Sequence, residues 1–121
     1  MSTLDEAKLL QNRTKAFAVR IIKAFARLPR EEAVRVIGRQ FLRSGTSLAG
    51  NYRAACRARS AADFISKISV VVEETDETLF RLELLVEAEL AKKSLVKPLM
   101  HECDELLKIF SASLATAKRN R

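Results

Sequence analysis

Apolar residues recur along most of this chain at alternating steps of three and four positions, with almost nothing to interrupt the pattern. Only 3 glycines and 2 prolines occur among 121 residues. β-Strands are joined by turns rich in Gly, Pro, Asn and Asp, and clusters of that kind are nearly absent here. Ala, Leu, Glu, Lys and Arg dominate instead, and these residues lose little conformational freedom in a helix. The sequence therefore predicts an all-α fold.

The periodicity divides the chain into four long amphipathic helices. They are expected to run from a Thr3–Glu6 capping box to the helix-stopping Pro29, from Glu31 to about Arg57, from a Ser60–Asp63 capping box to about Ala91, and onward from a start between Ser94 and Lys97. Short connections between long helices place consecutive helices antiparallel. We predict one domain over residues 1–121, an antiparallel up-down-up-down four-helix bundle whose basic tail frays over residues 118–121.

The apolar faces of the middle two helices indicate how these helices pack against their neighbours. Gly38 and Gly45 fall on the apolar side of the second helix, where missing side chains let a neighbouring helix approach closely. The stretch 44–47, Ser-Gly-Thr-Ser, has the weakest helical tendency, so any kink is expected there. The third helix carries a second seven-residue apolar row beyond the seam that one antiparallel pair requires. Such a wide buried face suits either the middle of a bundle or a subunit interface.

Several classes of protein are excluded by composition. No apolar run reaches the ~18 residues that a membrane-spanning helix requires. The first ten residues include Asp5 and Glu6 and lack the apolar core of a signal peptide, so a cytoplasmic location is expected. Cys56 and Cys103 have no metal-ligand spacing, and in a reducing compartment they are expected to be small buried apolar residues.

Candidate catalytic groups are few. The single histidine, His101, has Cys103 two positions further on, and residues at that spacing on a helix point in different directions. Pro98 stands where a Glu-x-x-His metal motif would need glutamate. The acidic cluster over residues 73–77 is therefore interpreted as a solvated or salt-bridged face, and no glycine-rich phosphate loop occurs. We expect no catalysis, metal, cofactor or small-molecule substrate.

The net charge of +7 is unevenly distributed along the chain. Residues 31–60 hold six basic side chains against two acidic ones, whereas residues 61–93 hold four against eight. At about 100° per residue, five arginines of the second helix share one strip roughly opposite its apolar side. This arginine stripe consists of Arg35, Arg39, Arg43, Arg53 and Arg57.

Two interpretations of the arginine stripe stay open from the residues alone. The guanidinium groups can follow a nucleic-acid backbone, each phosphate contact adding to the salt dependence of binding. They can equally pair with acids of the third helix, within one subunit or across an oligomer interface. The chain has 6 Phe, 1 Tyr and no Trp, most of them at core positions, which argues against a stacking platform for single strands.

The part of the chain from residue 43 to 85 resembles a known family. It matches a pattern of Ser-Gly-Thr-Ser at 44–47, Asn-Tyr-Arg at 51–53, Asp-Phe-Ile-x-Lys at 63–67 and Glu-Thr at 77–78. This pattern is similar to the central signature of the bacterial four-helix-bundle family also named 23S rRNA intervening-sequence proteins.

The resemblance implies a four-helix bundle that assembles as a homopentamer with a central channel. Related bundles serve as accessory factors of diversity-generating retroelements, where a basic pentamer is thought to bind nucleic acid and a reverse transcriptase. Two positions depart from the family pattern, because Ala54 stands in place of a common glutamate and Arg81 in place of a common tryptophan. Loss of a carboxylate beside the arginine stripe makes the second helix more basic and favours an anionic partner.

We therefore predict a non-enzymatic, oligomeric bundle that binds RNA or DNA independently of sequence through the arginine stripe. The alternative is a structural or protein-scaffolding homo-oligomer in which the same arginines make subunit contacts. The first prediction depends on the second helix being one unbroken rod, because only then do its distant guanidinium groups share a line.

Overall fold

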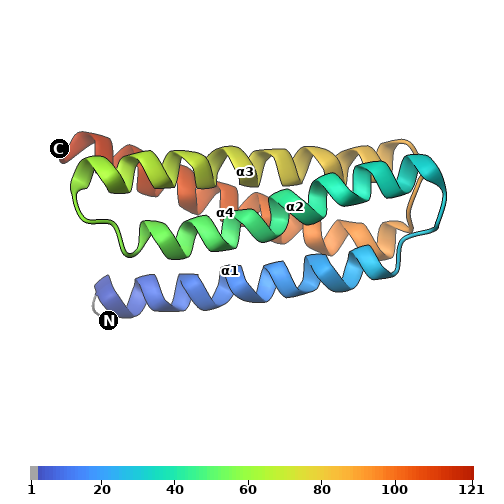
Figure 1. Cartoon of the computed structure of the whole chain (residues 1–121), viewed down its shortest axis with the longest axis horizontal. Helices are drawn as coiled ribbons and strands as arrows, with labels where there is room; N and C mark the ends of the chain where they lie inside the picture. Colours follow the sequence, from blue (N-terminus) through green and yellow to red (C-terminus); the bar gives the residue numbers. More distant parts are fainter. Residues whose placement is uncertain (1–2) are drawn as a thin grey trace.

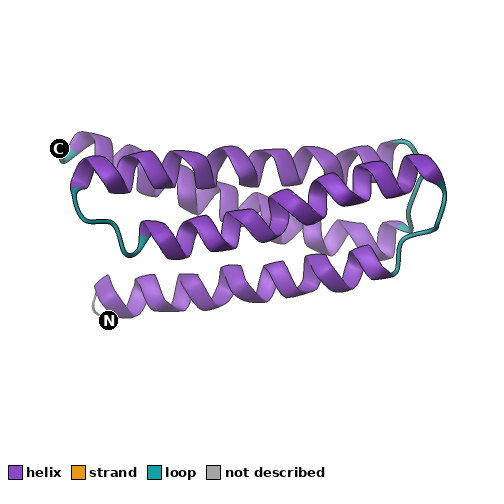
Figure 2. Cartoon of the chain, in the orientation of Figure 1, coloured by secondary structure: helices purple, strands orange, loops and turns teal. Residues whose placement is uncertain are grey.

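The computed structural model describes residues 3–121, with Thr3 described in its backbone only. This part of the chain forms four helices: α1 (Thr3–Ala26), α2 (Glu32–Ala55), α3 (Ala61–Glu87) and α4 (Lys93–Arg119). They run alternately up and down, so that both termini and the α2–α3 turn lie at the same end of the bundle (Figure 1). Only short turns connect the helices (Figure 2). The predicted antiparallel four-helix bundle is confirmed.

The helix ends differ from prediction by a few residues, and local backbone geometry gives the reason at α3. The hydroxyl of Ser60 accepts a hydrogen bond from the Asp63 backbone N–H at 3.0 Å, which confirms the predicted cap. At the other end α3 stops at Glu87, earlier than predicted, because Glu89 adopts the left-handed conformation with φ 57°. The Leu90 N–H then bonds to the Leu85 carbonyl at 2.9 Å, which closes a Schellman motif.

The other helix boundaries show smaller differences. α2 ends at Ala55, two residues before the predicted end. α4 begins at Lys93, one residue before the predicted range, with Pro98 inside the helix, and it extends through Arg119, further than predicted. α1 begins at Thr3, so the predicted Thr3–Glu6 capping interaction rests on a side chain outside the described residues.

The core is built from the apolar rows that the sequence predicts. The seam of α3 is buried from Ile68 to Leu85, and it meets the large buried side chains of the other helices: Phe17, Ile21, Phe41, Leu48, Leu106 and Phe110. α3 packs extensively against both α2 and α4, whereas α1 and α4 touch each other much less. The wide apolar face of α3 therefore reflects its place between two neighbours within one chain.

α2 is one uninterrupted helix through Ser44–Ser47, where a kink was expected if anywhere. A Cβ atom added at Gly45 would lie 2.9 Å from Ile21 Cγ2, and one added at Gly38 would lie 3.1 Å from Phe25 Cε1, with both neighbours on α1. These distances confirm that α1 approaches α2 closely at both glycines. Of the helices described, none combines the length and the apolarity needed to cross a membrane.

Candidate nucleic-acid interface

The solvent face of α2 is defined by what covers its two flanks. One flank, at Gly38 and Gly45, lies against α1. The other flank, at Ser44, lies against Thr78 of α3. Four members of the arginine stripe lie on α2 in the strip between these flanks, because α2 is continuous through residues 44–47, whereas Arg57 lies in the turn, two residues beyond the end of α2. Four of the stripe's five arginines are exposed and Arg35 is half-buried.

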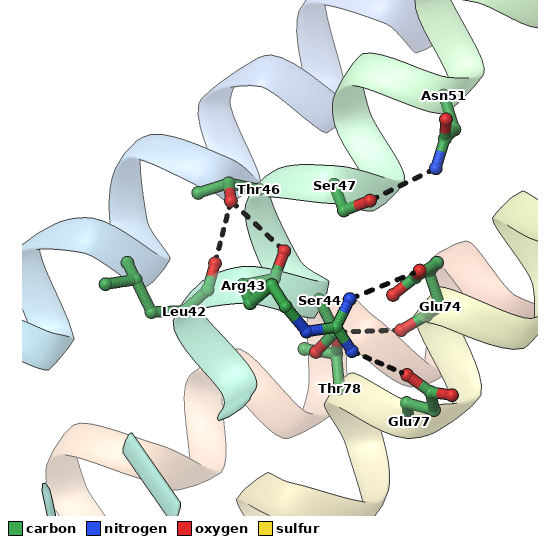
Figure 3. Close-up of polar contacts among 9 residues, drawn as sticks. All are labelled: Leu42, Arg43, Ser44, Thr46, Ser47, Asn51, Glu74, Glu77 and Thr78. Carbon is green, nitrogen blue, oxygen red and sulfur yellow. Dashed lines mark hydrogen bonds and ion pairs between the residues drawn. The ribbon is translucent and has the colours of Figure 1, made fainter. Parts of the chain in front are cut away.

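Arg43 is paired with acids of α3 in the same chain. Its guanidinium lies 3.2 Å from Glu77 Oε2 and 3.6 Å from Glu74 Oε1 (Figure 3). The second oxygen of Glu74 is buried without a hydrogen-bond partner in the described part of the chain. Arg43 is therefore the cation that compensates a partly desolvated carboxylate, which is a structural role within the subunit.

Polar side chains near Arg43 form hydrogen bonds between α2 and α3 and within α2. The hydroxyls of Ser44 and Thr78 lie 2.7 Å apart, and Asn51 Nδ2 donates to Ser47 Oγ at 3.1 Å (Figure 3). Thr46 Oγ1 bonds back to the Leu42 carbonyl at 2.8 Å. The Ser-Gly-Thr-Ser stretch thus satisfies its hydroxyl groups inside the helix and across the α2–α3 contact.

Arg35 belongs to the α1–α2 contact. Its guanidinium carbon lies 4.4 Å from the centroid of the Phe25 ring, a cation–π arrangement. Phe25 also lies edge-on to the buried Phe41 ring, with centroids 6.4 Å apart. Arg35 therefore covers an aromatic cluster between two helices and holds its charge close to the protein surface.

Arg39, Arg53 and Arg57 are the remaining members of the stripe. All three are exposed, and among residues 3–121 no carboxylate lies within 4.0 Å of their guanidinium groups. The structure thus divides the stripe into two arginines that make contacts within the chain and three whose hydrogen-bonding forks face solvent. Planar guanidinium forks of this kind suit phosphate oxygens.

A pocket of about 550 Å³ lies where α2 ends and α3 begins. Arg53 and Arg57 line it together with Arg59 and Lys67, two cations that the sequence analysis did not include in its candidate site. Arg59 lies in the turn, beyond the helical periodicity that defined the stripe. Lys67 lies on α3, and only the packing of α3 beside α2 brings it to the same pocket.

The one acid of this pocket, Asp63, is already engaged. Its carboxylate accepts a hydrogen bond from Lys67 Nζ at 2.6 Å and another from the Arg59 backbone N–H at 3.1 Å. These two contacts lower the pKa of the Asp63 carboxyl below its ordinary value. Asp63 therefore stays ionised and ties the turn that carries Arg59 to the first turns of α3.

The residues considered for catalysis lie apart, as their spacing predicts. His101 is exposed and its Nε2 lies 3.1 Å from Glu105 Oε1. Cys103 is fully buried and its thiol donates to the Thr75 carbonyl at 3.3 Å, while burial raises the pKa of this thiol to about 12. Within the described range, no three His, Cys, Asp or Glu side chains group together as metal ligands.

Cys56 differs from the sequence prediction, because it is half-buried instead of fully buried. It lies in the wall of a second hollow, of about 700 Å³, that opens beside α1. Leu9, Leu10 and Phe64 make this hollow largely apolar. Residues of α1, the α2–α3 turn and α4 line this hollow together, so one side of Cys56 stays uncovered.

Comparisons with known proteins agree with this fold. The family model described as 23S rRNA-intervening sequence protein matches residues 8–112. A crystal structure at 1.70 Å resolution of a protein with unknown function from the S23 ribosomal protein family of Bacteroides thetaiotaomicron VPI-5482 superposes with a TM-score of 0.82. The two sequences are 32% identical, and the similarity covers 90% of this chain and 97% of that one. A search of curated proteins finds no match.

Proposed function

The chain belongs to the 23S rRNA-intervening sequence protein family, and on this premise we propose that it is a non-enzymatic, oligomeric four-helix bundle that binds RNA or DNA independently of sequence. The observation that carries the proposal is the set of exposed, unpaired guanidinium groups of Arg39 and Arg53 on α2 and of Arg57 just beyond its end. A net charge of +7 adds a long-range attraction for polyanions. Such binding is dominated by phosphate contacts and weakens steeply with salt.

The spacing of these arginines suits an extended polyanion. Arg39 and Arg53 are separated by about 21 Å along the helix axis at about 1.5 Å per residue. That distance corresponds to roughly six base-pair steps of a duplex at about 3.4 Å per step. Contacts of this kind position a nucleic acid without reading its bases, which is why the proposal is for binding independent of sequence.

Oligomerisation is the second part of the proposal, and it uses other surfaces. Ile22 on α1 and Phe80 on α3 are each 50% exposed, and Val19 and Val70 are also exposed. We infer that these apolar side chains, which lie on two different helices, make subunit contacts that remove them from water. If these residues make the subunit contacts, the stripe stays free for an anionic ligand.

A protein-scaffolding homo-oligomer is the competing function, and the pairing of Arg43 with Glu74 and Glu77 favours it. That contact shows that a member of the stripe can be used within the protein. Sedimentation of a variant with Arg39, Arg53 and Arg57 changed to Gln separates the two functions. The nucleic-acid proposal expects an unchanged assembly, whereas dissociation would identify the stripe as a subunit interface.

Nucleic-acid binding itself is tested by fluorescence anisotropy with a mixed-sequence RNA and a DNA duplex at two salt concentrations. The same triple variant is expected to lose at least tenfold in affinity at low salt. Its salt slope should fall by about 2 to 3, because each phosphate contact contributes about 0.9.

The matched control removes the same amount of charge from the end of α1 and the turn after it, by changing Arg20, Lys23 and Arg27 to Gln. These three side chains line a shallow hollow beside α4, away from the stripe. The proposal expects the control to keep most of the affinity and nearly the whole salt slope. Equal losses in both variants would show that net charge alone drives binding, and no binding by the wild-type protein would remove the proposal.

A further inference from the structure

The positive charges that line the pocket at the α2–α3 turn outnumber its negative charges. Four cationic side chains and one carboxylate line it, a formal excess of three positive charges. The carboxylate, Asp63, is taken by Lys67 and by the backbone of Arg59. The guanidinium groups of Arg53, Arg57 and Arg59 have no ion pair with any carboxylate of residues 3–121. Like charges that share one hollow repel each other unless an anion lies between them.

The hollow also has room for such an anion. Gly50 and Ala54 line it between the long cationic side chains, and a Cβ atom added at Gly50 would meet nothing within 4 Å. The pocket volume of about 550 Å³ falls in the range of about 300 to 1,000 Å³ that is usual for small-ligand sites. A phosphate with part of its sugar can therefore enter the pocket itself, beyond the exposed line of the stripe.

We propose that this pocket is a phosphate-binding site, in which Arg53, Arg57 and Arg59 enclose a single phosphate group from α2 on one side and the turn on the other. Guanidinium forks donate paired hydrogen bonds to phosphate oxygens, so three of them can satisfy one group from several directions. Asp63 acts as a positioning residue, because it holds the Arg59 backbone and Lys67 in place.

The inference rests on the proposed function for the source of the phosphate, which is either an internal phosphodiester or the terminal phosphate of a nucleic acid. It differs from that function in one physical respect. A surface stripe responds only to charge, whereas a pocket also responds to shape. Filling the pocket without changing any charge therefore separates the two.

Gly50→Leu is the variant that fills it. The substitution keeps every charge, places an apolar side chain in the hollow, and replaces a mid-helix glycine by a better helix former, so the variant should fold at least as stably as wild type. Thermal unfolding checks this expectation. Arg59→Gln removes the one pocket arginine outside the stripe, and Arg39→Gln is its single-charge control outside the pocket.

The first measurement uses inorganic phosphate and needs no nucleic acid. In 15N-labelled wild-type protein at constant ionic strength, phosphate is expected to shift the backbone amide signals of Gly50 and Arg59 saturably. Leu in place of Gly50, or Gln in place of Arg59, should weaken that binding at least fivefold, and Arg39→Gln should not. Uniform, non-saturable shifts in wild type would overturn the pocket, whether or not the protein binds RNA.

The second measurement compares one RNA sequence with a 5′-phosphate and with a 5′-hydroxyl. Gly50→Leu is expected to lower RNA affinity at least fivefold. If wild type prefers the phosphorylated RNA and the variant does not, the pocket takes the terminal phosphate. If the wild type binds both RNAs equally and Gly50→Leu binds both more weakly, the pocket takes an internal phosphodiester. Wild-type affinity in Gly50→Leu for both RNAs would overturn the inference even where the stripe variants confirm RNA binding.

Discussion

Ser44 on α2 and Thr78 on α3 join their hydroxyl groups at 2.7 Å inside the bundle, and neither side chain is exposed (Figure 3). Thr78 Oγ1 also lies 2.8 Å from the Glu74 carbonyl of its own helix. This buried polar pair fixes which residues of α2 face α3, since a shift along or around the helix would separate the two hydroxyls. The pair therefore sets the direction in which the arginine stripe faces.

Removing both hydroxyls of this pair is expected to cost less than the sum of the two single removals. Thr78→Val leaves the Ser44 hydroxyl buried without its partner, so it should lower the free energy of unfolding by about 1 to 3 kcal/mol. Ser44→Ala should cost about 1 kcal/mol, because Thr78 keeps its bond to Glu74. Urea unfolding of both single variants and the double variant measures the coupling. A double variant that loses the full sum of the two single losses would contradict the account.

Glycine-to-alanine changes in α2 should have opposite signs at two positions. At Gly50 the added Cβ meets nothing, so Gly50→Ala should raise the free energy of unfolding by about 0.5 to 1 kcal/mol through helix propensity. At Gly45 the Cβ would press on the fully buried Ile21, and overpacking costs about 1 to 3 kcal/mol before the propensity gain. Chemical denaturation of both variants decides this, and stabilisation by Gly45→Ala would show that α1 moves aside.

The α3 C-terminus carries a strained residue. Glu89 has a φ of 57°, in the left-handed region that costs a residue with a Cβ about 1 kcal/mol. Glu89→Gly should therefore raise the melting temperature, because glycine is the usual residue at this position of a Schellman motif. Glu87→Gly, two residues earlier and inside the helix, is the matched control and should lower it. Lower stability in Glu89→Gly would contradict the backbone argument.

The ion pair between α1 and α4 should make stability depend on pH in the acidic range. Arg13 Nη2 lies 2.7 Å from Glu102 Oε1, and this hydrogen bond lowers the pKa of the Glu102 carboxyl. A carboxyl whose pKa is lower in the folded state stabilises the fold above its unfolded pKa, and that stabilisation is lost as the pH falls through the folded pKa.

The corresponding variant is Glu102→Gln. The loss in free energy of unfolding that it causes should be present at neutral pH, and it should shrink as the pH falls through the lowered folded-state pKa of Glu102 in the wild-type protein. Asp63 also has a lowered pKa but is common to both proteins, so its contribution cancels in the difference. Denaturant unfolding from about pH 7 to about pH 3 gives the curve. A deficit that stays constant over this range would contradict the assignment.

The two thiols should react at very different rates in the folded protein. Cys103 is fully buried with a pKa raised to about 12, so neither access nor thiolate formation favours its reaction. Cys56 is half-buried in the wall of the apolar hollow and can be reached. Titration with a chromogenic disulfide should modify one thiol quickly in buffer and both in denaturant. Cys56→Ser should abolish the quick phase, and its loss in Cys103→Ser instead would reverse the assignment.

Much of the fold follows from residues that are close in the sequence. The spacing of Phe17 and Ile21, or of Ile68 and Val71, is enough to identify helices and their buried faces, because both depend on the helical repeat alone. The Ser60 cap and the close approach at Gly45 follow in the same way from local chemistry. The common strip of four of the five arginines is also a local property, since it requires only that α2 continue through residues 44–47, whereas Arg57 lies beyond the end of α2.

Local sequence patterns could not predict which arginines of the candidate site are paired and which are free. Whether an arginine is free depends on which acid or ring a neighbouring helix places beside it, and that depends on the packing between helices. The Phe25 ring lies under the guanidinium group of Arg35. Two acids of α3, Glu74 and Glu77, pair with Arg43, whereas no described carboxylate pairs with Arg53. The half-buried position of Cys56 also depends on tertiary packing, since residues of α1 and α4 help to line the hollow beside it.

The sequence by itself determined an all-α bundle, the buried face of each helix and the line of arginines on α2. Tertiary structure alone decided which of those arginines remain unpaired, and it joined Arg59 of the turn and Lys67 of α3 to two of them in one pocket. The reason is the distance along the sequence over which each kind of contact is determined. A helical repeat places side chains that are a few residues apart, whereas ion pairs and pockets form between segments whose relative position is fixed by the packed core.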